Sequence, residues 1–150
     1  MKFNRIFLAI LVVLVVSCVG AAVAAEASVA DHTFTIPDGF HILNSTDDST
    51  ILEQDDNHAI VVMVSDEVGT VEDARQSLES KGYKFLGSDT YNADGKDVQQ
   101  QNYGTDTLTI MAYVFDVGDE KCIVTYTIPS TETPPEGVDN PVTTILNSIE

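Results

Sequence analysis

Hydrophobic and polar residues follow different periods in different parts of the chain. Residues 33–36 alternate polar and apolar side chains, the period-two pattern of a strand with one buried face. Residues 59–64 form a continuous apolar run, which is typical of a central strand covered on both faces. The pattern predicts further strands at residues 40–43, 50–53, 83–91, 96–103, 108–115 and 121–128. Together these strands predict a largely antiparallel sheet.

Turn residues separate the predicted strands. Pro37, Asp38 and Gly39 end the first strand, and the polar residues 44–49 form a loop. Asp94-Gly95 lies between two strand patterns and is a strong signal for a tight hairpin, because both residues tolerate a positive φ. Gly118 offers the same freedom to a second hairpin.

The first predicted helix covers residues 70–81. Thr70 is its N-cap candidate, Asp73 follows three residues later, and Gly82 is placed as the C-terminal cap. The apolar stripe on this helix is narrow and contains Val71, Ala74 and Leu78.

The second predicted helix covers residues 140–150, with Asp139 or Asn140 as cap and Pro141 at its first position. Its apolar residues recur at the spacing of a core-facing stripe, namely Val142, Ile145, Leu146 and Ile149. We therefore expect an α+β fold, with a largely antiparallel sheet flanked by helices as an α-β-α sandwich. Residues 33–150 are predicted to form this single domain, preceded by a polar lead-in at residues 26–32.

The first 25 residues have the organisation of a secretory signal peptide. Lys2 and Arg5 form a basic region, residues 6–16 form an apolar stretch, and small residues precede a cleavage site after Ala24 or Ala25. Two alternatives remain open. The uncharged run at residues 6–25 is long enough for a membrane anchor, and Cys18 lies in a degenerate lipobox where it would carry a lipid. All three interpretations predict a secreted or cell-surface domain.

Removal of this segment would leave a strongly acidic chain. Two of the seven basic residues lie within it and none of the 24 acidic ones does, so the remaining net charge would be −19. Such a charge excludes nucleic acid as a partner, and it also excludes membrane contact beyond an N-terminal anchor, because both need a basic patch. The acidity has four alternative explanations. They are solubility outside the cell, adaptation to salt, weak binding of divalent cations, and docking onto a basic surface.

Candidate chemistry is sparse. Cys122 follows the period of a buried strand face and has no base nearby in sequence, so a buried thiol is the expected role. Asp55, Asp56 and His58 are the one cluster that could share a calcium or zinc ion. The Asn92–Gly95 turn fails the spacing of a calcium loop, which would place Gln101 where a bidentate carboxylate is needed. No catalytic, cofactor-binding or metal-binding residue is assigned. Asn44 begins a glycosylation sequon in a predicted surface loop.

The segment Phe34-Thr-Ile-Pro-Asp-Gly-Phe40 resembles the opening strand and turn of the Mog1/PsbP-like superfamily, which includes DcrB-type and LpqN-type exported proteins. The late strand from Cys122 to Pro129 and the closing helix around residues 145–149 extend the resemblance over residues 33–150. This sequence departs from the superfamily pattern at Phe40, a position where tryptophan is frequent. The resemblance implies an antiparallel sheet between helices and a non-enzymatic role. The combination of a short signal segment and an acidic domain rich in Asp, Ser, Thr and Asn is also similar to small exported proteins of methanogenic archaea.

We therefore expect an exported, non-catalytic acidic domain that acts as a binding or interaction module at the cell surface. Its partner would be a protein, a cell-wall polymer or a small ligand, contacted through the acidic loops or through Gln99, Gln100 and Gln101. The alternative is a metal-dependent binder or enzyme that uses the loop containing Asp55, Asp56 and His58.

Overall fold

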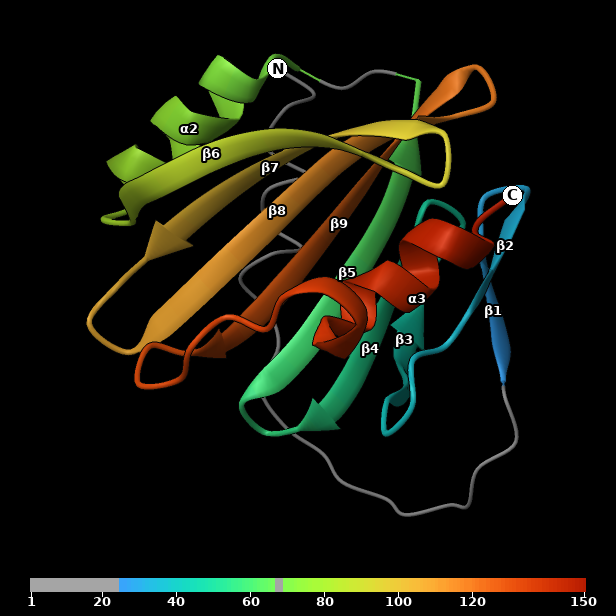
Figure 1. Ribbon diagram of the computed structural model, residues 1–150, viewed down its shortest axis with the longest axis horizontal. Helices are drawn as coiled ribbons and strands as arrows, with labels where there is room; N and C mark the ends of the chain where they lie inside the picture. Colours follow the sequence, from blue (N-terminus) through green and yellow to red (C-terminus); the bar gives the residue numbers. More distant parts are fainter. Residues whose placement is uncertain (1–24, 67–68) are drawn as a thin grey trace.

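The computed structural model describes residues 25–66 and 69–150, and a seven-stranded antiparallel sheet dominates that part of the chain (Figure 1). The strand order is β3-β4-β5-β9-β8-β7-β6. The strands are β3 (His41–Ser45), β4 (Ser49–Asp55), β5 (His58–Ser65), β6 (Lys84–Ala93), β7 (Lys96–Gly104), β8 (Leu108–Val117) and β9 (Glu120–Pro129). Two runs of consecutive hairpins therefore meet where β5 pairs with β9, at a register that places Val62 opposite Val124.

The predicted strands and turns of the large sheet are confirmed to within a few residues. Asp94 and Gly95 have φ values of 50° and 76° and connect β6 to β7 as a two-residue turn. Both dihedrals match the turn type whose twist suits an antiparallel hairpin. Gly118 has a φ of 59° and lies in the turn between β8 and β9.

Both predicted helices are present, as α2 (Val71–Ser80) and α3 (Pro141–Ser148). Thr70 Oγ1 accepts a hydrogen bond from the Asp73 backbone N–H, and the Asp73 carboxylate accepts one from the Thr70 N–H, forming a capping box. Gly82 follows α2 with a φ of 89°, a conformation that favours glycine. Asn140 caps α3 by accepting a hydrogen bond from the Val142 N–H.

The main core lies on the face of the sheet that α3 covers, which we call the α3 face. A small second sheet, β1 (Glu26–Val29) with β2 (His32–Thr35), packs beside α3 (Figure 1). Glu150 lies beside β2, where it exchanges two backbone hydrogen bonds with Thr33, of 3.1 and 3.2 Å. The buried side chains here include Phe34, Leu52, Ile60, Val62, Met111, Tyr113, Phe115, Cys122, Val124, Val142, Ile145 and Leu146.

A smaller core lies on the opposite face, under α2. Leu78 of α2 packs with Tyr103 of β7 and Ile110 of β8. Arg75 places its guanidinium 4.3 Å from the centre of the Phe85 ring at the same end of the sheet. Among the described residues, α2 is the helix that packs on this face, at one end of the sheet.

The predicted fold class, an α+β α-β-α sandwich, is wrong. The described chain is mainly β: its helices contain only 10 and 8 residues beside a sheet of seven strands, and neither forms a layer. The apolar run at residues 59–64 predicts helices or a second layer on each face of the sheet. On the α3 face, part of that covering comes from β1 and β2 instead, because a pair of strands also buries apolar side chains while satisfying its own backbone hydrogen bonds.

The predicted lead-in at residues 26–32 is part of this fold. Glu26–Val29 form β1, and its residues alternate between exposed and buried, with Ala27 and Val29 in the main core. The predicted signal segment, with its cleavage, anchor and Cys18 alternatives, lies outside the described residues except for Ala25. Within residues 25–66 and 69–150, no helix combines the length and apolarity needed to cross a bilayer.

Candidate functional site

The turn between β4 and β5 brings Asp55 and His58 together. Asp55 is the last residue of β4 and His58 the first of β5. Asp55 Oδ1 accepts hydrogen bonds from the backbone N–H groups of Asn57 and His58, at 2.8 and 3.1 Å. This is the way an aspartate side chain commonly shapes a tight turn. The turn then positions the His58 Nδ1 atom 2.8 Å from the same Asp55 oxygen.

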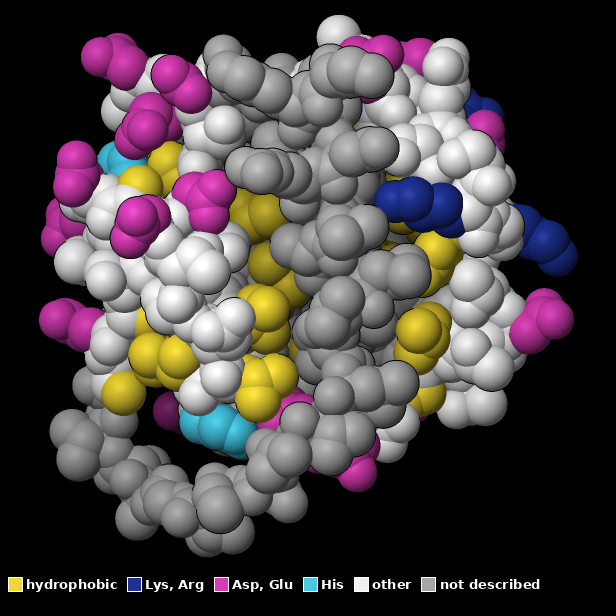
Figure 2. All heavy atoms as spheres, turned by 180° about the vertical axis from the view of Figure 1, so that it is seen from behind, with side chains coloured by type: hydrophobic (Ala, Val, Ile, Leu, Met, Phe, Trp, Pro, Cys, Tyr) yellow, Lys and Arg dark blue, Asp and Glu magenta, His cyan; other side chains and the backbone are white. Residues whose placement is uncertain are grey.

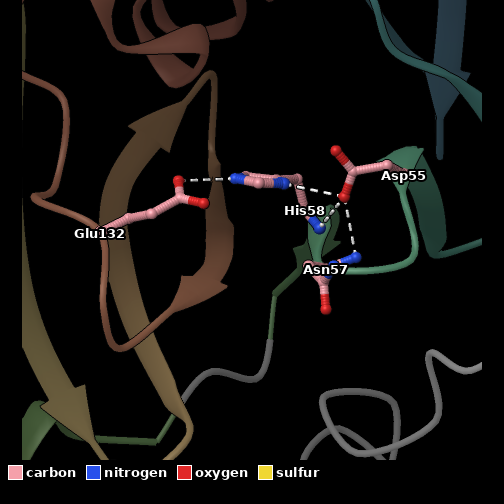
Figure 3. Close-up of polar contacts among 4 residues, drawn as sticks. All are labelled: Asp55, Asn57, His58 and Glu132. Carbon is pink, nitrogen blue, oxygen red and sulfur yellow. Dashed lines mark hydrogen bonds and ion pairs between the residues drawn. The ribbon is translucent and has the colours of Figure 1, made fainter.

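A third residue completes the cluster from a distant part of the chain. Glu132 follows β9, and its Oε2 atom lies 2.9 Å from His58 Nε2 (Figure 3). The His58 side chain is 16% exposed, whereas those of Asp55 and Glu132 are 52% and 49% exposed. Both ring nitrogens therefore face carboxylate oxygens. Since an ionised carboxylate only accepts hydrogen bonds, a protonated imidazolium is the state that satisfies both contacts.

The electrostatics of the cluster agree with this assignment. Burial lowers the pKa of His58, but its hydrogen bonds to Asp55 and Glu132 outweigh that effect, and the pKa is raised overall. Burial raises the pKa of the Asp55 carboxyl, because it disfavours the charged form. The hydrogen bonds of Asp55 with His58 and Asn57 outweigh this effect, so the pKa is lowered overall. The favoured state is one positive ring between two negative carboxylates.

This arrangement is poorly suited to catalysis or to holding one metal ion. A general base needs a ring nitrogen directed at a substrate or nucleophile, and both nitrogens of His58 already have carboxylate partners. The two carboxylates lie at opposite sides of the ring, so one ion could not contact all three groups. Within the described residues, no group of three or more His, Cys, Asp or Glu side chains has metal-binding geometry.

The sequence predicted part of this cluster. Asp55 and His58 are in contact, as their spacing indicated, whereas Asp56 is exposed in the turn between them. The third member is Glu132, which the sequence analysis did not identify. It is 74 residues from His58, and only the pairing of β5 with β9 brings the two segments together.

The other two histidines also lie near carboxylates. His32 Nε2 of β2 is 2.8 Å from Glu120 Oε2 at the start of β9. His41 Nε2 of β3 is 3.6 Å from Glu53 Oε2 and has a side chain that is 43% exposed. His58 differs from both because two carboxylates engage its ring.

Cys122 has the environment of an inert thiol. It is buried in the main core, as the sequence predicted. Burial raises the pKa of its thiol far more than the charge of Lys96 lowers it. A thiolate nucleophile is therefore strongly disfavoured at this position.

Gln99, Gln100 and Gln101 do not form one contact surface. They are consecutive in β7, so their side chains alternate between the two faces of the sheet. Gln101 accepts a hydrogen bond from the Tyr103 hydroxyl, and Gln100 Nε2 donates one to Asn102 Oδ1 at 3.0 Å. Gln99 is exposed and Gln100 and Gln101 are partly exposed, so a partner on one face of the sheet could contact Gln99 and Gln101 together but not Gln100.

The acidic loops are exposed. Asp31 lies between β1 and β2, and Asp47 and Asp48 lie between β3 and β4, all with exposed side chains. Acidic side chains gather along one edge of the molecule, and Lys and Arg side chains lie towards the opposite edge (Figure 2). Asn44, the sequon asparagine, is exposed on the edge strand β3 instead of in a loop.

Comparison with known proteins identifies a fold relationship. No family model matches the chain, and no curated protein matches it. A crystal structure from Bacteroides thetaiotaomicron has a TM-score of 0.52 and 12% identity over 79% of this chain. This chain spans only 44% of that protein's length. A Pseudomonas aeruginosa protein of unknown function has a TM-score of 0.40 and 14% identity, covering 71% of this chain and 83% of its own.

Proposed function

We propose that this protein is an exported, non-catalytic acidic domain that serves as a binding or interaction module at the cell surface. The observation that carries the proposal is the state of its reactive side chains. The His58 ring is occupied by carboxylates on both sides, and the Cys122 thiol is buried with a raised pKa. The candidate chemical groups therefore serve the fold, and what the described domain offers to a partner is its acidic surface.

The acidic turn between β3 and β4 is the proposed contact surface. Asp47 and Asp48 are exposed at the end of an edge hairpin, where a basic partner can approach without displacing any core residue. Carboxylates at such a site accelerate association with a basic surface more than they strengthen the final complex. The partner would be a basic protein or cell-wall polymer.

Export is the second part of the proposal, and it rests on the arrangement of basic, apolar and small residues at positions 1–25. Intact mass of the protein purified from its native source tests it. Cleavage after Ala24 or Ala25 gives a chain shortened by that segment, a lipid on Cys18 adds mass to a chain that begins there, and an anchor leaves the full length. A full-length, unmodified protein in the cytosol would contradict export. The same spectrum reports any glycan on Asn44.

A matched pair of double variants tests the contact surface. Asp47→Asn with Asp48→Asn should slow and weaken capture of the native partner by the mature protein. Asp94→Asn with Asp97→Asn removes the same charge from the β6–β7 hairpin at the opposite edge of the sheet, and should leave capture intact. Equal capture by both variants and by the wild type would show that the acidity serves only solubility.

A further inference from the structure

The segment that carries Glu132 is attached to the domain at its two ends. We call residues 130–136, between β9 and the short 3-10 helix η2 (Gly137–Asp139), the strap. At its start, the Ser130 N–H donates to Thr107 O at 2.9 Å and the Ser130 hydroxyl donates to Asp106 O at 2.8 Å. Beyond its end, the Thr143 hydroxyl of α3 donates to Gly137 O at 2.7 Å.

Between these ends, the contact with His58 is the one side-chain attachment to the sheet. Among the residues inside the strap, all of which the structure describes, Glu132 is the one whose side chain forms a hydrogen bond to another element. Its backbone N–H bonds only to Pro129 O, within the same turn. Pro134 and Pro135 have no N–H to donate. The middle of the strap is therefore held by the ion pair with His58.

We propose that His58 is a proton-operated clasp, which fastens the strap to the β4–β5 turn when its ring is protonated and releases Glu132 when the proton leaves. The geometry implies that loss of the proton releases only one of the two carboxylates. A neutral imidazole has one N–H donor, so it can bond to only one of the two carboxylates.

Asp55 is the partner that His58 would keep. It lies three residues away in the same turn and is already fixed by the N–H groups of Asn57 and His58. With Nδ1 donating to Asp55, the Nε2 lone pair would point at the carboxylate of Glu132, and these two acceptors repel each other. The interior of the strap has no other side-chain hydrogen bond to another element, so the strap interior is the part that moves.

The surroundings of the ring allow this titration to control the contact. The other charged and titratable groups near the ring are acidic or phenolic: Asp55 and Asp56 from the turn, Glu132 from the strap, and Tyr126 of β9, whose pKa is raised by burial and by the charges of Glu132 and Asp55. The two carboxylates that contact the ring, Asp55 and Glu132, favour the imidazolium. The raised pKa of His58 agrees with the geometry and places the release above the ordinary pKa of histidine.

Nuclear magnetic resonance of the mature protein tests the clasp directly. His58 ring signals are titrated with pH. Amide exchange of Glu132, whose N–H donates to Pro129 O, is followed over the same range and corrected for intrinsic base catalysis. Exchange in the strap should accelerate about two- to fivefold across the His58 midpoint, the size expected for a partly exposed ion pair. Strap exchange that stays constant while His58 titrates would overturn the proposal.

Two substitutions separate the clasp from a general effect of pH. Glu132→Gln should lower the His58 midpoint and remove the pH step in strap exchange. Glu120→Gln removes the partner of His32 in the same chemical way and should leave both observations unchanged. Glu132 is half exposed, so the variant is expected to keep the fold, and amide signals outside the strap report this. A pH step that persists in Glu132→Gln would also overturn the proposal.

Discussion

The strap and the helix that follows it are held by two contacts of opposite character. At one end, Glu132 forms an ion pair with His58 in which both carboxylate partners are about half exposed. At the other end, Asn140 donates from Nδ2 to the Tyr113 hydroxyl at 2.8 Å, with exposed fractions of 8% and 1%. Burial raises the pKa of Tyr113 to about 12, more than its bond to Asn140 lowers it, so this second contact stays neutral at physiological pH.

The difference shows how burial divides the roles of polar contacts in this domain. A buried neutral hydrogen bond is costly to lose because its partner is left without water, whereas an exposed ion pair loses little. The Asn140 contact therefore fixes where α3 docks on the sheet. The Glu132 contact depends on a proton and is weak enough to open while the domain remains folded.

The largest effect is expected when the hydrophobic packing around the buried contact is broken. Ile145→Ala removes a fully buried side chain from α3 and should lower the free energy of unfolding by about 2 to 5 kcal/mol. Urea denaturation measures this value. Val138→Ala is the control, because its side chain is 93% exposed and its loss should cost at most about 0.5 kcal/mol. Similar costs for the two variants would mean that α3 does not pack as described.

Removal of the buried polar contact should have the next largest effect. Asn140→Ala deletes the cap of α3 and the partner of Tyr113, and should lower the free energy of unfolding by about 2 kcal/mol. Tyr113→Phe removes the same contact from the other side. The double variant should cost less than the sum of the two single variants. Full additivity would contradict coupling between these residues.

A smaller and pH-dependent effect is expected at the exposed contact. The folded state binds the His58 proton more tightly than the unfolded state, so this stabilisation is fully present below the ordinary pKa of 6.5 and is lost as pH rises through the raised pKa. His58→Gln should therefore lower the free energy of unfolding by about 1 kcal/mol or less at pH 6 and have almost no effect at pH 9.

His41→Gln provides the comparison for that experiment. His41 is more exposed and lies 3.6 Å from its carboxylate, beyond ordinary hydrogen-bond length. Its replacement should cost less than that of His58 at pH 6. If the cost of His58→Gln is the same at pH 6 and pH 9, the imidazolium between two carboxylates is not the stabilising state.

The smallest effect is expected from metal ions. Millimolar calcium or zinc should leave the melting temperature of the mature protein unchanged within error, because the carboxylates beside His58 lie at opposite sides of the ring. A clear rise that disappears in Glu132→Gln would instead support the metal-dependent alternative. A rise that survives this substitution would locate the ion elsewhere.

The sequence was sufficient wherever a structural feature depends on neighbours a few residues apart. The capping box of Thr70 and Asp73, the Asp94-Gly95 turn and the stripe on α3 each follow from local chemistry, and each was predicted. β1 was missed although residues 26–29 alternate exposed and buried side chains, because the segment is short and follows a predicted cleavage site.

Long-range pairing accounts for what could not be predicted. The residues on the β4–β5 turn were recognised as a cluster, but nothing local indicated that Glu132 would join them across 74 positions. The covering of the apolar run at residues 59–64 also depends on which segments meet across the sheet.

The chain by itself determined the seven strands of the large sheet, the N-terminal caps of both helices, the tight turns and the burial of Cys122, because these depend on side-chain period and on backbone preferences within one element. Only the tertiary structure decided that the domain is mainly β, that β5 lies beside β9, and that His58 lies between two carboxylates. These features depend on contacts between elements far apart in sequence, and such contacts leave no periodic trace in the order of the residues.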